Sequence, residues 1–251
     1  MTTSSRARLF AIALIVTGIV LIGIRLLNAD QAIRSITDLT ALSPFSNFPP
    51  ELAQNVKALI TIPIGILVLV LVRQFIGMPT LGTFMPVLIG VAFRETGPLV
   101  GFLLFAIILL IGICVRMFFS QLQLLLVPRL AAVLIVVVAA MLAVAFASVN
   151  LDLRLAPSAS LFPLVILAMT IERLVVTWEE SGPRAGLTHL SGSLFVALLS
   201  YAVMTLHWVE VVMFGLPEVL LILLGTVVMI GRYVGLRLNE YFRFNELARS
   251  R

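Results

Sequence analysis

Residues 98–120 read PLVGFLLFAIILLIGICVRMFFS, and this stretch decides the class of fold. Arg116 is its only charged residue. A helix of this length rises about 35 Å at about 1.5 Å per residue. That is enough to cross the roughly 30 Å of hydrocarbon in a bilayer. The stretch therefore predicts a membrane-crossing helix.

The whole chain has the same character as this stretch. Of its 251 residues, 61% are hydrophobic and 12% are charged, whereas soluble domains carry roughly 25% charged residues. We therefore predict an all-α fold, a polytopic membrane helical bundle with the lipid bilayer as its main solvent. The predicted segments number about eight and lie near 9–27, 58–76, 80–93, 98–120, 129–149, 160–178, 187–206 and 211–231.

Charge and proline content divide the chain into two parts. Residues 1–57 are predicted to be an N-terminal membrane anchor and a short extracytoplasmic loop, since Pro44, Pro49 and Pro50 follow the first apolar run. Residues 58–251 are predicted to form a domain of seven transmembrane segments. Its C-terminal end mixes arginines with Tyr and Phe, which suits a basic amphipathic tail on the lipid headgroups.

Two of the segments are unusual, because one is too short to cross comfortably and the other is interrupted by Glu172 and Arg173. The segment at 80–93 contains Pro86 and the one at 160–178 contains Pro163. Broken segments of this kind mark binding sites in transporter-like folds. The turn sequences that follow them also match, and they read Glu95-Thr96-Gly97-Pro98 and Glu180-Ser181-Gly182-Pro183. Because long apolar helices flank both, the pattern indicates an inverted repeat of three helices.

Polar and charged residues in or beside these segments predict a substrate pathway. A charge at the bilayer centre costs roughly 2.5–3.5 kcal/mol, so it normally pairs or faces the interior of the bundle. Most of these polar and charged residues lie on one face of a helix, because they recur every three or four positions in the sequence. The candidate pathway residues are Arg94, Glu95, Thr170, Glu172, Arg173, Thr177 and Glu180. The alternative is that the charges are helix-end pairs that only fix register.

The basic residues are nearly all arginines at the ends of apolar runs. With the N-terminus in the cytoplasm, most of them fall on the cytoplasmic side, as the positive-inside rule requires. This predicts a multi-pass protein of a bacterial inner membrane with both termini cytoplasmic. No basic patch or stripe forms, so the net charge of +5 does not indicate nucleic acid as a partner.

Sequence motifs of soluble enzymes are absent. The chain has no P-loop, dinucleotide fingerprint, His-Glu-x-x-His or nucleophile elbow. Cys114 is the single cysteine, and His189 and His207 have no partner at metal-ligand spacing. We therefore expect no catalytic residue, no metal and no cofactor, which is typical of a non-enzymatic membrane subunit.

Several longer motifs point to one family. They are Gly82-Thr83-Phe84-Met85-Pro86-Val87-Leu88-Ile89, Ala92-Phe93-Arg94-Glu95-Thr96, Val127-Pro128-Arg129-Leu130, Phe162-Pro163, Met169-Thr170-Ile171-Glu172-Arg173, Trp178-Glu179-Glu180 and Gly231-Arg232-Tyr233. Over roughly 58–246 the chain resembles the bacterial membrane proteins described as seven transmembrane helices fused to an inactive transglutaminase domain. Residues 28–57 leave no room for that domain after the first helix.

The resemblance implies a partner. Members of this family look to be encoded beside an ATP-grasp ligase similar to glutamate ligases. The proline-centred segments are also similar to the membrane subunit of capsule-type poly-γ-glutamate synthases. Together these imply that the chain anchors a cytoplasmic ligase to the membrane. The chain would also export the acidic peptide that this ligase makes. The residues expected to dock the partner are Arg116, Arg129, Glu179, Arg184, Arg232 and Arg237.

Two other functions stay open at this point. The first is a secondary transporter for a small solute, built on the same inverted repeat. The second is a membrane sensor or scaffold without a substrate pathway. Self-association into a homo-oligomer is open in each case.

Overall fold

The structure is a computed structural model that describes residues 3–28, 43–121, 126–150 and 161–232. These residues form helices and their connections, which confirms the predicted all-α fold. The chain divides into two compact units. Unit 1 comprises Met1–Met78 and Ala202–Arg251, and unit 2 comprises Pro79–Tyr201.

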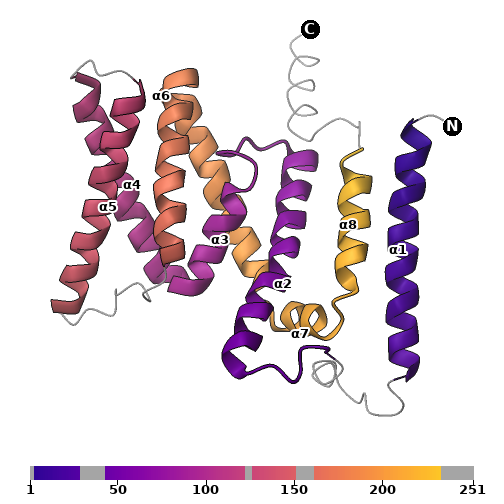
Figure 1. The fold of residues 1–251 in the computed structure, drawn as a ribbon. Helices are drawn as coiled ribbons and strands as arrows, with labels where there is room; N and C mark the ends of the chain where they lie inside the picture. The colour runs from indigo at the N-terminus through magenta and orange to yellow at the C-terminus, as the bar shows by residue number, and fades with distance from the viewer. Residues whose placement is uncertain (1–2, 29–42, 122–125, 151–160, 233–251) are drawn as a thin grey trace, which may run out of the picture. The chain divides into compact units, whose positions relative to one another are not determined.

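Each unit has its own set of helices (Figure 1). Unit 1 contains α1 (Thr3–Asn28), α2 (Pro50–Leu71) with its π-helical continuation η2 (Val72–Ile76), α7 (His207–Gly215) and α8 (Val219–Ile230). Unit 2 contains α3 (Met85–Thr96), α4 (Pro98–Gln121), α5 (Leu126–Asn150) and nearly all of α6 (Leu161–Met204).

Length and hydropathy identify the helices that can cross a bilayer. Among the described residues these are Ala7–Leu27, Pro50–Ile76, Pro98–Phe119 and Val165–Met204, with the bent pair α7–α8 as a fifth if it counts as one span. Helix α3 has 12 residues and rises only about 18 Å. The segment predicted at 80–93 is therefore too short to cross, as its sequence indicates.

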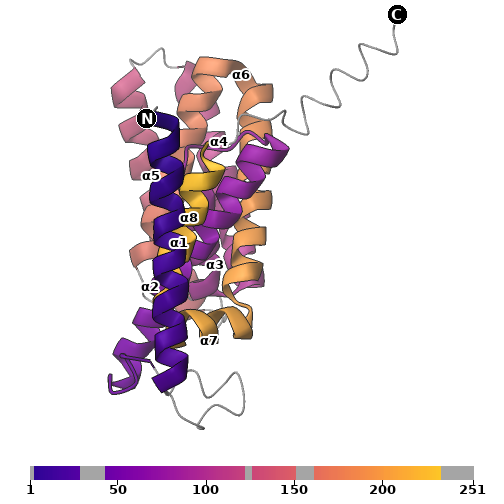
Figure 2. The same cartoon turned by 90° about the vertical axis from the view of Figure 1, so that its right-hand side faces the viewer.

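In unit 1, α1 packs against α8 in the opposite direction (Figures 1 and 2). A Cβ atom added to Gly18 would lie 2.8 Å from Cγ1 of Ile222. One added to Gly225 would lie 2.6 Å from Cγ1 of Ile15 and 2.8 Å from the carbonyl oxygen of Ala11. These distances leave no room for a side chain. Glycine on each helix thus allows the close approach that stabilises helix pairs in membranes.

The predicted segment at 211–231 is not a single helix. Helices α7 and α8 meet at a bend of 108°, next to Pro217, which has no N–H to continue a helix. Ile60 of α2 packs with Val209 and Met213 of α7 to form a small core in unit 1. The apolar run continues across the break, which is why the sequence pattern joins the two helices.

In unit 2, α6 is a hairpin of two arms. Its backbone leaves the helical conformation at Gly182, where φ is 85° and ψ is 170°. Both arms extend from this turn (Figures 1 and 2). They correspond to the segments predicted at 160–178 and 187–206.

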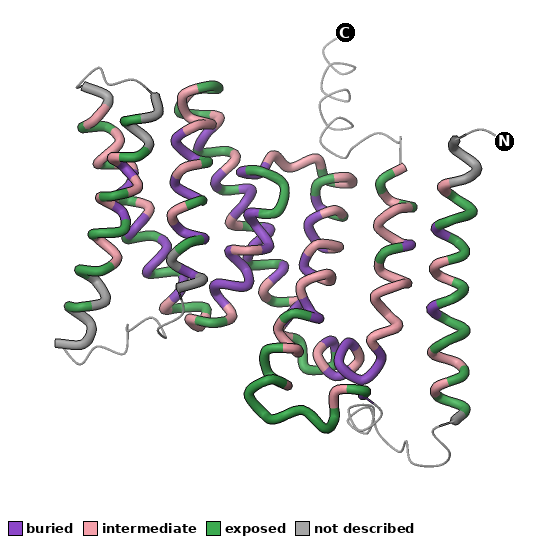
Figure 3. Tube along the Cα trace, viewed as in Figure 1, coloured by how far each residue is buried: buried purple, intermediate pink, exposed green. Residues whose placement is uncertain are grey.

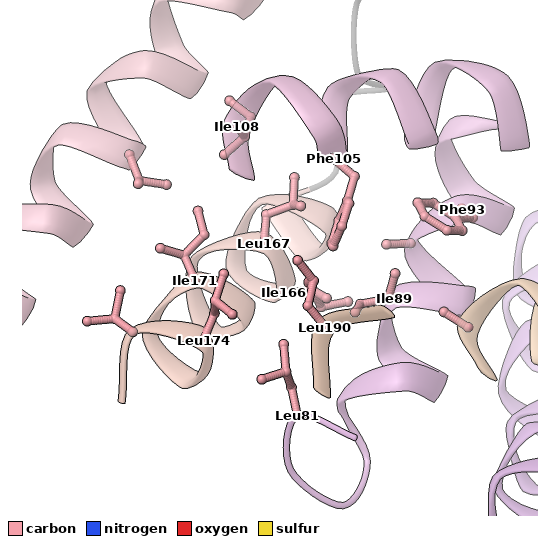
Figure 4. Packing of buried hydrophobic residues seen from close by; sticks show 14 of the residues in the cluster. Leu81, Ile89, Phe93, Phe105, Ile108, Ile166, Leu167, Ile171, Leu174 and Leu190 are labelled. Atoms are coloured by element: carbon pink, nitrogen blue, oxygen red, sulfur yellow. The ribbon is translucent and has the colours of Figure 1, made fainter. Parts of the chain in front are cut away.

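The core of unit 2 is assembled from α3, α4, α5 and both arms of α6. Figure 4 shows its centre, which includes Ile89, Phe93, Phe105, Ile108, Ile166, Leu167, Ile171, Leu174 and Leu190. The rings of Phe93 and Phe105 meet edge to face with centroids 6.1 Å apart, a geometry worth about 0.5–1.5 kcal/mol beyond its burial. This core joins residues from α3 to the second arm of α6 into one packed body.

Large apolar side chains also cover the outside of the helices. Leu99 is 85% exposed, Leu27 80% and Phe146 74%, and exposed residues recur along α1 (Figure 3). Soluble proteins rarely expose contiguous apolar surface on this scale. A lipid-facing surface explains the exposure, so the fold is that of a multi-pass membrane protein.

Candidate functional site

Two Gly-Pro joints organise unit 2. Gly97-Pro98 connects α3 to α4, and Gly182-Pro183 connects the two arms of α6. Gly97 has φ 82° and ψ 149°, and Gly182 has φ 85° and ψ 170°. This backbone region is essentially restricted to glycine, and the proline that follows is suited to the first position of a helix. The two joints are the same kind of turn.

The residues around the joints also match. An aromatic residue stands four positions before each joint glycine, and a second glycine stands four positions after it. A Cβ atom added to Gly101 would lie 2.9 Å from Cδ1 of Phe93, and one added to Gly186 would lie 3.4 Å from Cε3 of Trp178. In each hairpin, therefore, the aromatic side chain packs on a glycine of the next helix. The two hairpins therefore match in their side-chain packing as well as in their sequence.

The two hairpins point in opposite directions within unit 2. In Figure 1 the joint between α3 and α4 lies at the lower end of this unit, and the turn of α6 lies at its upper end. Pro163 follows Pro86 by 77 positions, whereas Gly182 follows Gly97 by 85. The first arm of the second hairpin is thus eight residues longer, about two helical turns.

Pro86 and Pro163 begin their helices and do not break them. Pro86 lies in the first turn of α3 and Pro163 in the first turn of α6, and both are buried. A proline in the first turn loses no helical hydrogen bond. The interruption that the sequence predicts at Pro86 lies just upstream, where residues 79–84 are not helical.

This non-helical segment, residues 79–84, rests on the second arm of α6. The backbone N–H of Leu81 donates to the hydroxyl oxygen of Ser193 at 2.6 Å, and Ser193 is fully buried. A Cβ atom added to Gly192 would lie 2.2 Å from the carbonyl oxygen of Pro79. Irregular backbone at membrane depth must find its hydrogen-bond partners inside the protein. Gly192 supplies the space and Ser193 the partner, and neither residue was predicted from the sequence.

A charged cluster lies beside the Gly182 joint. Arg116, near the end of α4, holds its guanidinium carbon 4.8 Å from the ring centroid of Trp178, within the range of a cation–π contact. Its Nη2 atom lies 3.9 Å from Oε1 of Glu179. The side chains of Arg116 and Glu179 are only 12% and 15% exposed. The cluster joins the first hairpin to the second at this end of unit 2.

Exposed charges surround both joints. Glu180 and Arg184 flank Gly182 and are exposed. At the other joint, Glu95 is exposed and Arg94 is half-buried. Each end of unit 2 therefore presents charged side chains, and the Gly182 end also contains the Arg116 cluster.

The residues of the predicted polar stripe on the first arm of α6 differ in burial. Thr170 is fully buried, and its hydroxyl donates to the carbonyl oxygen of Ile166 at 2.7 Å. The hydroxyl of Thr177 donates to the carbonyl oxygen of Arg173 at 2.8 Å. Arg173 itself is exposed, and Glu172 is half-buried. The structure thus does not gather these residues on one buried face, and their pathway role stays a prediction.

Of the other residues predicted to dock a partner, only Arg232 is described with its side chain. It lies in unit 1, just after α8, and is half-buried. Arg129 belongs to α5, but its side chain and the whole of Arg237 lie outside the described residues, as does most of the predicted basic tail.

One ion pair was not predicted from the sequence. In unit 1, Nη1 of Arg25 lies 2.5 Å from Oε1 of Glu218, and both side chains are about four-fifths buried, at 22% and 21% exposed. It joins the end of α1 to the start of α8. The signal was present, because a charge at the end of an apolar run is expected to find a partner.

The described residues contain no group of three or more His, Cys, Asp or Glu side chains that could hold a metal ion. The model of a family described as "7 transmembrane helices usually fused to an inactive transglutaminase" matches residues 12–248. No curated protein and no solved structure matches the chain.

Proposed function

Since the chain belongs to the family of seven-transmembrane-helix proteins that are usually fused to an inactive transglutaminase, we propose that it is a non-catalytic membrane subunit. Its partner is a cytoplasmic ATP-grasp peptide ligase of the glutamate-ligase kind. The subunit anchors this ligase to the bilayer and passes its acidic peptide product across.

The placement of charge at the Gly182 joint carries this proposal. Arg116 and Glu179 form a nearly buried pair there, and Glu180 and Arg184 stand exposed on either side of the turn. A turn with exposed charges of both signs offers a partner a specific docking surface, because complementary charges set orientation and partner choice.

The proposed setting is a bacterial inner membrane with both termini in the cytoplasm. Arg116 and Arg184 then lie on the cytoplasmic side, in agreement with the positive-inside rule. The Gly182 joint faces the ligase, and the Gly97 joint with Arg94 and Glu95 faces the opposite side. The proposed pathway for the acidic product uses Arg94, Glu95 and Arg173 with the polar residues of the first arm of α6.

The docking role is tested by affinity purification from gently solubilised membranes followed by mass spectrometry. The wild-type chain is expected to recover an ATP-grasp ligase, and the charge reversal Arg184→Glu is expected to lose it. Arg73 is exposed in unit 1, so Arg73→Glu is the matched control and should retain the ligase. Recovery of the same ligase with Arg184→Glu would remove Arg184 from the docking surface, and absence of any ligase from the wild type would refute the partnership.

The inverted hairpins favour a second candidate function, secondary transport of a small solute. Inverted repeats with irregular backbone beside them are typical of such transporters, and residues 79–84 supply that backbone. Uptake of a solute by liposomes that contain only the purified chain would favour this function over the ligase partnership.

A further inference from the structure

Helix α7 of unit 1 is too short to cross a bilayer. Its nine residues, His207–Gly215, rise only about 14 Å, which is half the thickness of the hydrocarbon. We infer that α7 is an interfacial helix, which lies in the plane of the membrane at the boundary between hydrocarbon and lipid headgroups. Trp208 is the residue that contacts the lipid there. This role needs neither a ligase nor a transported solute, so it goes beyond the proposed function.

The direction of α7 follows from its neighbours in unit 1. Helix α1 is long and apolar enough to cross a bilayer, and α8 packs against it in the opposite direction (Figures 1 and 2). Helix α8 therefore runs in the crossing direction. The bend between α7 and α8 is 108°, so α7 is close to perpendicular to α8. It therefore lies along the plane of the membrane.

The edge of the hydrocarbon is marked on α2. Residues 58–72 carry no charge and are bounded by Lys57 and Arg73, which are about 24 Å apart along the helix. Lysine and arginine at the ends of a crossing segment extend toward the headgroups, which lets the segment between them fill the hydrocarbon. Lys57 therefore marks one edge of the hydrocarbon and Arg73 the other.

Helix α7 contacts α2 at the edge that Lys57 marks. Nζ of Lys57 lies 5.0 Å from the ring centroid of Phe214, near the end of α7. Val209 and Met213 of α7 pack with Ile60 of α2, which is one helical turn deeper than Lys57. The depth of α7 is therefore between the level of Ile60 and the headgroups.

Helices α1 and α8 give the same level independently. Residues 9–24 carry no charge and are bounded by Arg8 and Arg25, which are about 26 Å apart along α1. Arg25 pairs with Glu218, which follows the last residue of α7 by three positions. The chain thus leaves α7 at a charged pair that belongs to the edge of the hydrocarbon.

Burial shows which part of α7 is available to lipid. Val209, Val211, Met213 and Phe214 are buried, whereas Trp208 is 58% exposed. Tryptophan is enriched at membrane interfaces because its ring is apolar and its indole N–H can donate to polar groups. For an exposed tryptophan at the edge of the hydrocarbon, the lipid headgroup layer is the partner that fits both parts of the side chain.

The depth of Trp208 can be measured by fluorescence quenching. The chain has two tryptophans, Trp178 and Trp208, so Trp178→Phe leaves Trp208 as the only reporter. We would reconstitute this full-length variant in phosphatidylcholine vesicles whose acyl chains are brominated either near the headgroup or near the terminal methyl group. Iodide in the aqueous phase is the third quencher, because it reaches side chains that face water.

The control for depth is Val16→Trp in a chain that also carries Trp178→Phe and Trp208→Phe. Val16 is 51% exposed on α1 and lies midway between Arg8 and Arg25 in the sequence. A tryptophan at this position therefore reports on the centre of the bilayer.

Trp208 is expected to be quenched more strongly by the shallow bromines than by the deep ones. The corresponding depth is about 8–15 Å from the bilayer centre, between the level of Ile60 and the edge of the hydrocarbon. Val16→Trp should show the reverse order of quenching. If Trp178→Phe fails to fold, the difference between the wild type and Trp208→Phe gives the same profile for Trp208.

Three results would overturn the inference. Quenching of Trp208 by the deep bromines that equals or exceeds quenching by the shallow ones would place α7 inside the bilayer core. Quenching by iodide without quenching by either lipid would place it in water. Absence of quenching by all three would mean that protein covers Trp208.

Discussion

Replacement of Gly192 by alanine tests how unit 2 accommodates non-helical backbone. The new Cβ atom would lie 2.2 Å from the carbonyl oxygen of Pro79, and ordinary contact begins at 3.4 Å. Pro79 must therefore move by about 1.2 Å, since overpacked groups have to shift. A shift of that size would carry Leu81 away from Ser193 and break their 2.6 Å hydrogen bond.

The expected loss of stability follows from these two effects. Overpacking costs about 1–3 kcal/mol, and a buried N–H without a partner costs about 1–3 kcal/mol more. Alanine regains about 1 kcal/mol over glycine inside a helix. We therefore expect Gly192→Ala to destabilise the protein by about 1–5 kcal/mol.

The assay is equilibrium unfolding in mixed micelles of increasing sodium dodecyl sulfate, followed by circular dichroism. Gly23 is the matched control, because a Cβ atom added there meets nothing within 4 Å. Gly23→Ala should be as stable as the wild type or more stable by up to about 1 kcal/mol. If Gly192→Ala were as stable as Gly23→Ala, the close packing of residues 79–84 on α6 would be refuted.

Five further substitutions test other parts of the structure by the same unfolding assay. Ser193→Ala should cost about 1–3 kcal/mol because it leaves the N–H of Leu81 without its acceptor; an unchanged midpoint would contradict that hydrogen bond. Gly97→Ala and Gly182→Ala should each cost about 1–3 kcal/mol because alanine is strained in this backbone region; a neutral effect at either position would mean that the joint relaxes without loss. Arg25→Ala and Glu218→Ala should each destabilise unit 1, and a double-mutant cycle should give a coupling of about 0.5–3 kcal/mol. A coupling of zero would show that the pair adds nothing to the packing of α1 on α8.

Local sequence patterns predicted most of the helices. The run at 98–120 became α4 over Pro98–Gln121, and the turn sequence at Gly182 became the joint of the α6 hairpin. Both predictions are confirmed because an apolar run and a Gly-Pro pair determine the conformation of residues next to them in the sequence. The bend between α7 and α8 was missed, since hydrophobicity is continuous through Leu216 and only Pro217 signals the break.

Contacts between distant residues were much harder to predict. Ser193 and Leu81 are 112 positions apart, and Arg25 and Glu218 are 193 positions apart. Periodicity along one helix says nothing about which residue of another helix lies opposite. The polar stripe shows the same limit, because Thr170 and Arg173 fit one face by spacing alone but differ in burial once α6 packs in unit 2.

The location of the peptide product tests the proposed function most directly. Inverted membrane vesicles expose the cytoplasmic face, so the purified ligase, ATP and amino-acid substrate can be supplied from outside. We expect acidic peptide to accumulate inside vesicles that contain this chain and to stay outside vesicles that lack it. Product that remains entirely in the external medium in both cases would contradict the proposed export.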